Sequence, residues 1–149
     1  MLTFDANVLI YASDPSEPMR REIAQRVIGR STGVATFLTN QSIGEFCNVV
    51  RRKKLLSARE AEAQVKAWSI FFNVVPTALS QLLEAAVLAE RRRKQFWDMV
   101  LLQVAADSGA TVLLSEDIGD GEVIEGVRIL NPFNPANHEA LEAILTPSP

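Results

Sequence analysis

Short apolar runs alternate along this chain with segments of helical periodicity, and this alternation limits the folds it can adopt. Runs rich in β-branched residues occur at residues 2–4, 34–38, 73–75, 111–114 and 127–130. Strands separated by helices are typical of a parallel sheet with crossover connections and helices on both faces. We therefore predict an α/β fold, a three-layer α/β/α sandwich around a parallel sheet of four to five strands.

The intervening segments predict helices at residues 7–12, 20–29, 40–52, 58–71, 80–92 and 96–108. Their apolar positions recur at i, i+3, i+4 and i+7. Ser57 and Glu60 form a capping-box signature, and Gly109 lies where a helix C-terminus favours glycine. Two stripes are expected to face the core: Leu82, Leu83, Ala86 and Ala89 in one helix, and Trp97, Val100, Leu101, Val104 and Ala105 in the next.

At 149 residues the chain has the length of one domain. We assign residues 1–133 to this domain and residues 134–149 to an extension with a short helix at 139–145 and a frayed Pro-Ser-Pro end. Cys47 is the single cysteine, which excludes an intramolecular disulfide, and its apolar neighbours predict a buried thiol. No segment is long and apolar enough to span a bilayer and none resembles a signal peptide, so we expect a cytoplasmic protein without a membrane partner.

The net charge of −3 argues against a protein that coats nucleic acid without regard to sequence. Positive charge is nevertheless concentrated, because eight of the fifteen basic residues lie in two runs. Such runs could hold a phosphate backbone, or they could be solvated helix ends, where cations are favoured. The runs are Arg51, Arg52, Lys53 and Lys54, and Arg91, Arg92, Arg93 and Lys94.

Two acidic residues follow predicted strands directly. Asp5 ends the first strand and Asp117 comes shortly after the fourth. Ligands of open α/β sheets bind beyond the carboxyl ends of the strands, and strands one and four flank the switch point in a common strand order. Asp5 could instead cap the next helix. Asn7 could hold a metal-bound water, orient Asp5, or serve as a cap.

Two further acids lie on predicted helices beside apolar stripes. Glu45 adjoins Phe46 and could alternatively close a capping box with Ser42, although an earlier helix start is favoured. Asp98 follows Phe96-Trp97, where an acid could simply stabilise the helix N-terminus. Clustered carboxylates repel one another unless cations bind among them, and Mg²⁺ prefers carboxylate and water ligands. Asp5, Glu45, Asp98 and Asp117 therefore predict a divalent-metal site, and such sites hydrolyse phosphodiesters.

The loop around Asp117 contains three other polar candidates. Ser115 could bind a phosphate oxygen or a metal-bound water. Glu116 is expected to be solvated, and Asp120, within a glycine-rich turn, is a reserve metal ligand. His138, the only histidine, and Cys47 cannot form a zinc cluster.

With these residues in order, the chain resembles the PIN-domain ribonucleases, specifically the VapC-type toxins of bacterial toxin–antitoxin pairs. The likeness extends from Leu2 to Phe133. The matching pieces are Phe4-Asp5-Ala6-Asn7-Val8-Leu9, Glu45-Phe46, Phe96-Trp97-Asp98, Leu114-Ser115-Glu116-Asp117 with Asp120-Gly121, and Leu130-Asn131-Pro132-Phe133.

The resemblance implies a Mg²⁺ or Mn²⁺ site formed by Asp5, Glu45, Asp98 and Asp117, assisted by Asn7 and Ser115. It also implies endonucleolytic RNA cleavage, inhibition by an antitoxin, and homodimers. Arg91–Lys94 is the favoured run for the RNA backbone, with Arg51 and Arg52 as the second. Ala6 departs from the family, whose members often carry a hydroxyl residue there.

Two other functions remain open from the sequence. A phosphatase of the haloacid-dehalogenase type would use Asp5 as nucleophile, but it usually needs an aspartate where Asn7 stands, and a lysine after Lys94. A PIN-like fold could also serve only as a protein-binding module, since fold alone does not determine function.

Overall fold

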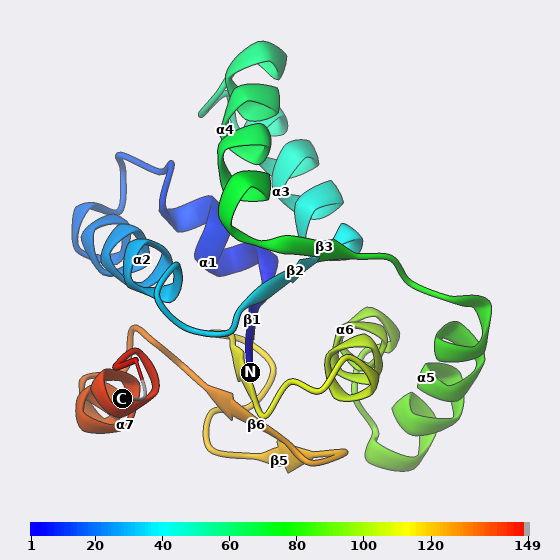
Figure 1. The fold of residues 1–149 in the computed structure, drawn as a ribbon. Helices are drawn as coiled ribbons and strands as arrows, with labels where there is room; N and C mark the ends of the chain where they lie inside the picture. Colours follow the sequence, from blue (N-terminus) through cyan, green and yellow to red (C-terminus); the bar gives the residue numbers. More distant parts are fainter. Residues whose placement is uncertain (148–149) are drawn as a thin grey trace.

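The computed structural model describes residues 1–147, and its centre is a mostly parallel sheet (Figure 1). Strands β1 (Leu2–Phe4), β4 (Val112–Leu114) and β6 (Val127–Leu130) pair in parallel, and β5 (Val123–Ile124) runs antiparallel to β6 at the edge. A parallel pair, β2 (Phe37–Thr39) and β3 (Asn73–Val75), joins β1 through a bridge between Leu2 and Thr36. The strand order β3-β2-β1-β4-β6-β5 confirms the predicted α/β fold.

Seven α-helices connect and cover these strands within the described residues. They are α1 (Ala6–Tyr11), α2 (Pro18–Ser31), α3 (Asn40–Arg52), α4 (Ala58–Phe71), α5 (Leu79–Arg92), α6 (Phe96–Asp107) and α7 (His138–Ile144). Local signals explain several boundaries. Thr39 Oγ1 accepts a hydrogen bond from the Ser42 amide and starts α3, and the predicted capping box of Ser57 and Glu60 starts α4. Gly109 follows α6 with φ of 81°, a conformation that favours glycine.

The sheet separates two apolar clusters, which produces the predicted three layers. Successive strand residues point to opposite faces, so Leu114 packs with α1 and α2 whereas Leu113 packs with α5 and α6. Leu130 and Ile129 of β6 divide in the same way. Figure 1 shows α2 and α7 on one side of the sheet, α5 and α6 on the other, and α3 with α4 projecting beyond its edge.

Several predicted side-chain orientations are wrong. In α5 the core side chains are Ala85 and Leu88, whereas Leu83 is 63% exposed; Ala86 is also exposed. Trp97, expected in the buried stripe of α6, is 60% exposed. Cys47 is only partly buried. Strand β5 was not predicted, because its two residues lie in a glycine-rich turn segment.

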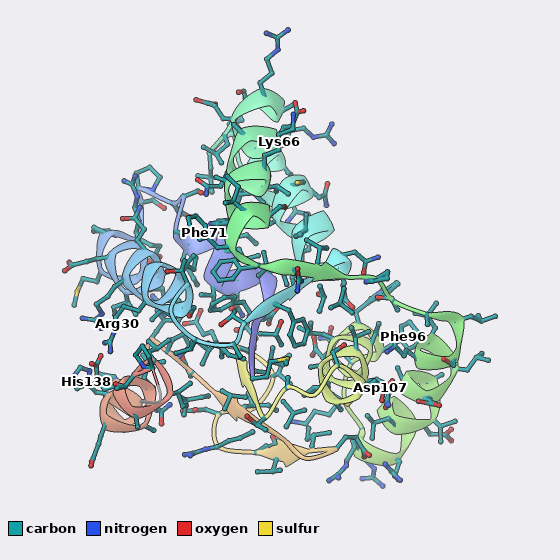
Figure 2. All side chains as sticks on the ribbon, in the orientation of Figure 1. Arg30, Lys66, Phe71, Phe96, Asp107 and His138 are labelled. Carbon is teal, nitrogen blue, oxygen red and sulfur yellow. The ribbon has the colours of Figure 1, made fainter. Side chains whose placement is uncertain are left out.

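The residues after Phe133 pack onto the domain. Leu141 and Leu145 are buried in the cluster that contains α2, and an Arg30–Glu142 ion pair joins α2 to α7, which lie side by side in Figure 2. Asp120 accepts hydrogen bonds from the Asn131 amide and from the side chains of Asn134 and Asn137. These hydrogen bonds anchor the C-terminal segment, and Asp120, the predicted reserve metal ligand, does not line the cleft that the four acids share.

The last two residues of the predicted frayed end, 148 and 149, lie outside the described residues. Among residues 1–147, no helix is long and apolar enough to cross a bilayer.

Candidate active site

Two loops meet where β1 and β4 end. The Asp5 amide donates to the Leu114 carbonyl at 2.9 Å, and the Ser115 amide donates to the Leu130 carbonyl at 3.1 Å, so the pairing continues just past the strands. The chain leaves β1 toward α1 on one face, and β2 and β4 lie on either side of β1. This is the switch point at which open α/β sheets bind ligands, and Asp5 and Asp117 lie there as predicted.

A hydrogen-bonded chain connects the two loops. Ser115 Oγ donates to Asp5 Oδ2 at 2.7 Å, and Asn7 Nδ2 donates to the same oxygen at 3.1 Å. Asn7 Nδ2 also lies 3.3 Å from Asp117 Oδ2, and the Asp117 amide donates to Ser115 Oγ at 3.3 Å. Asp5 precedes α1 but makes no side-chain capping bond. Its carboxylate is held mainly by Ser115 and Asn7, which belong to the site.

The four predicted acids line one cleft of about 1150 Å³. Asp5 and Asp117 come from the strand ends, Glu45 from α3 and Asp98 from the first turn of α6. Because Thr39 caps α3, Glu45 is not the capping-box partner of Ser42 and is exposed to the cleft. The fold thus brings together residues that are distant in sequence.

Burial and repulsion from neighbouring carboxylates disfavour ionisation of Asp5 and Asp98. The pKa of Asp5 is raised to about 6, mainly by burial and also by the nearby Glu45 and Asp98 charges, although hydrogen bonds from Ser115 and the Ala6 amide oppose the rise. Burial also raises the pKa of Asp98, together with repulsion from Asp117, against the attraction of Lys94. A cation in the cleft would relieve both effects.

The donor set fits a hard divalent ion that keeps part of its water shell. Among residues 1–147, no three acidic, histidine or cysteine side chains already converge as a closed cage. Mg²⁺ is usually held by one or two carboxylates together with waters and substrate phosphates, so it needs no such cage. Asn7 Oδ1 is buried at the site and has no hydrogen-bond partner among residues 1–147. Such an acceptor would be satisfied by an ion-bound water.

The two basic runs occupy different environments. Arg52 and Lys53 line the cleft, and neither forms an ion pair with a described residue. Arg51 lines a separate groove between α3 and α4. In the other run Arg91 pairs with Glu125, and Lys94 with Glu122 and the Ile118 carbonyl. None of Arg91, Arg92, Arg93 and Lys94 lines the cleft.

The prediction that Glu116 is solvated is wrong. Its carboxylate accepts hydrogen bonds from Tyr11 Oη at 2.8 Å and from Arg20 Nη2 at 2.6 Å. The Arg20 guanidinium also lies over the Tyr11 ring, 5.3 Å from its centroid. The network braces the loop that carries Asp117. Sequence reasoning missed Tyr11 and Arg20 because no local pattern links them to Glu116.

Comparisons with known proteins identify the fold. A protein-family model described as the PIN domain matches residues 2–119. The crystal structure of Mycobacterium tuberculosis VapC20, described as a sarcin-ricin loop cleaving toxin, superposes with a TM-score of 0.66 at 16% identity, covering 78% of this chain and 90% of that one. A comparison with curated proteins gives no match. The family match spans most of the sequence, and the chain therefore belongs to the PIN-domain family.

Proposed function

We propose that this protein is a Mg²⁺- or Mn²⁺-dependent endoribonuclease and the toxin of a type II toxin–antitoxin pair that acts in the cytoplasm. The observation that carries the proposal is that Asp5, Glu45, Asp98 and Asp117 all line one cleft at the switch point. The family match and the RNA-cleaving activity stated for VapC20 support it.

In this mechanism the chain orients the ion and holds the substrate. Asp5, fixed by Asn7 and Ser115, and Asp98 are the proposed direct ligands, since burial and repulsion favour a cation beside them. A bound divalent ion would supply an activated water and stabilise charge on the phosphoryl oxygens. Glu45 and Asp117, which line the same cleft, would complete the set of carboxylates that holds the ion. Arg52 and Lys53 would neutralise phosphates of the RNA.

The site gives no support to an aspartyl-phosphate mechanism. The position that would carry its acid/base group is Asn7, whose amide donates to Asp5. Lys94, the last lysine, is paired with Glu122.

Metal dependence is the direct test of the proposed chemistry. We expect the purified protein to cleave single-stranded RNA internally with Mg²⁺ or Mn²⁺, to stop when EDTA removes the ion, and to resume when either ion is restored. Cleavage should be followed by gel electrophoresis of an end-labelled RNA. Undiminished cleavage in EDTA, or none with either ion, would contradict the proposal.

The toxin assignment implies two protein partners, a second copy of this chain and an antitoxin. Exposed apolar side chains suited to protein contact occur on α4, β3 and α5: Ile70, Phe71, Val74, Leu79, Leu83 and Val87. For the homodimer, light scattering during size-exclusion chromatography should give twice the mass of one chain at micromolar concentration. The mass of one chain would exclude it.

A further inference from the structure

Trp97 is an exposed indole at the edge of the acidic cleft. It precedes Asp98, lines the same cleft and is 60% exposed. The other tryptophan, Trp68, is 7% exposed and packs edge-on against Phe46 in the core. An apolar surface as large as an indole is normally buried, because its transfer from water is favourable. The exposed ring therefore needs an explanation.

The backbone that carries Trp97 is held in place. Gln41 Nε2, on α3, donates to the Trp97 carbonyl at 2.9 Å, which joins α3 to the start of α6. The Phe96 ring packs edge-on against the indole, with centroids 5.1 Å apart, and Phe96 itself packs against the core between the sheet and α5. The indole is thus supported from one side, and little freedom remains to be lost when a ligand binds.

The cleft that Trp97 lines also carries the positive charge expected for binding a nucleic-acid strand. Arg52 and Lys53 line the same cleft and form no ion pairs within the described residues. Asp5 and Asp117 line the cleft from the ends of β1 and β4, and Asp98 directly follows Trp97. Proteins that bind single strands combine cations for the backbone with aromatic rings on which bases stack. A duplex keeps its bases stacked on one another and cannot offer such a face.

We propose that Trp97 stacks a nucleobase of single-stranded RNA next to the phosphate that is cleaved. This inference rests on the proposed function and specifies its substrate as unpaired nucleotides. Every base has a π face, so Trp97 supplies affinity and position and does not itself select a base.

Fluorescence can test this stacking without cleavage. In the Asp98→Asn background, in which cleavage is expected to be about three orders of magnitude slower, Trp68→Phe leaves Trp97 as the only tryptophan, and Trp97→Phe leaves Trp68. We expect a short single-stranded RNA to quench the first protein and not the second, and a duplex of the same sequence to quench neither. If Trp68→Phe does not fold, the difference between the protein with both tryptophans and Trp97→Phe gives the same signal.

Affinity and kinetics provide the second measurement. Trp97→Ala should weaken binding of the single strand about tenfold and raise KM by a similar factor, whereas Trp97→Phe, which keeps an aromatic face, should retain most of the affinity. If RNA quenches Trp97 fluorescence but the wild-type protein cleaves no RNA with either Mg²⁺ or Mn²⁺, the proposed function is overturned and the stacking stands. Cleavage and binding unchanged in Trp97→Ala would overturn the stacking alone. Trp97 emission that responds to protein concentration but not to RNA would also overturn it and assign the ring to a contact between copies.

Discussion

Asparagine in place of Asp98 is expected to lower the RNA cleavage rate by about three orders of magnitude. Asp98 lines the cleft, and burial and Asp117 raise its pKa, which marks it as a group that a cation would stabilise. Metal ions contribute several kcal/mol to charge stabilisation in phosphoryl transfer, and each ~1.4 kcal/mol changes a rate tenfold. Single-turnover cleavage at saturating Mg²⁺ measures the change. The rise in melting temperature caused by Mn²⁺ should also disappear.

The same helix offers a matched control. Asp107 ends α6, where its carboxylate accepts hydrogen bonds from Gln81 and Gln103, and it does not line the cleft. Asp107→Asn removes the same charge from the same helix, so we expect near wild-type cleavage and an intact Mn²⁺ response. An Asp98→Asn protein that cleaves as fast as Asp107→Asn would exclude Asp98 from the metal site.

Half of the acidic site was predictable because Asp5 and Asp117 follow strands that lie side by side in the sheet. Asp5 and Asp117 immediately follow apolar runs, and parallel strands place their carboxyl ends at one edge. Glu45 and Asp98 lie on helices, where local spacing alone equally allowed capping or dipole roles. The structure places both in the cleft, a result of helix packing that no local pattern encodes.

The environment of the site was not predictable, for two physical reasons. Helix α6 is apolar on most of its surface, so its spacing could not show that Trp97 faces the cleft while Val100 faces the core. Long-range polar pairs leave no local signature, and Glu116 bonds to Arg20 across 96 residues of sequence. Asp120 similarly has a turn-like sequence context, but its partners, Asn134 and Asn137, lie in the C-terminal segment.

The site acids should also show a conflict between stability and function. Asp5→Asn is expected to abolish cleavage and yet raise the free energy of unfolding of the metal-free protein at pH 7.5 by roughly 1–3 kcal/mol. The pKa of Asp5 is raised to about 6 in the fold, mainly by burial, from an ordinary value of 3.8. Each unit of difference between folded and unfolded states corresponds to about 1.4 kcal/mol.

The sign follows from which state binds the proton more tightly. Asp5 binds its proton more tightly in the folded protein than in the unfolded chain. The free energy of unfolding of the metal-free wild type therefore falls as pH rises from about 4 to about 6, and Asp5→Asn shows no such fall. Urea unfolding with EDTA should therefore show the stability gain at pH 7.5 and its disappearance near pH 4. Saturating Mn²⁺ should reverse the order at pH 7.5, because only the wild type gains from the ion.

Asp120→Asn is the matched control of opposite sign. Hydrogen bonds from Asn131, Asn134 and Asn137 outweigh burial and lower the pKa of Asp120, so its charge stabilises the fold above pH 3.8. Its asparagine variant should be less stable than the wild type at pH 7.5, with or without Mn²⁺, because it cannot accept all these bonds as a carboxylate does. If Asp5→Asn and Asp120→Asn change the free energy of unfolding in the same direction in EDTA, the buried charge of Asp5 does not destabilise the metal-free fold.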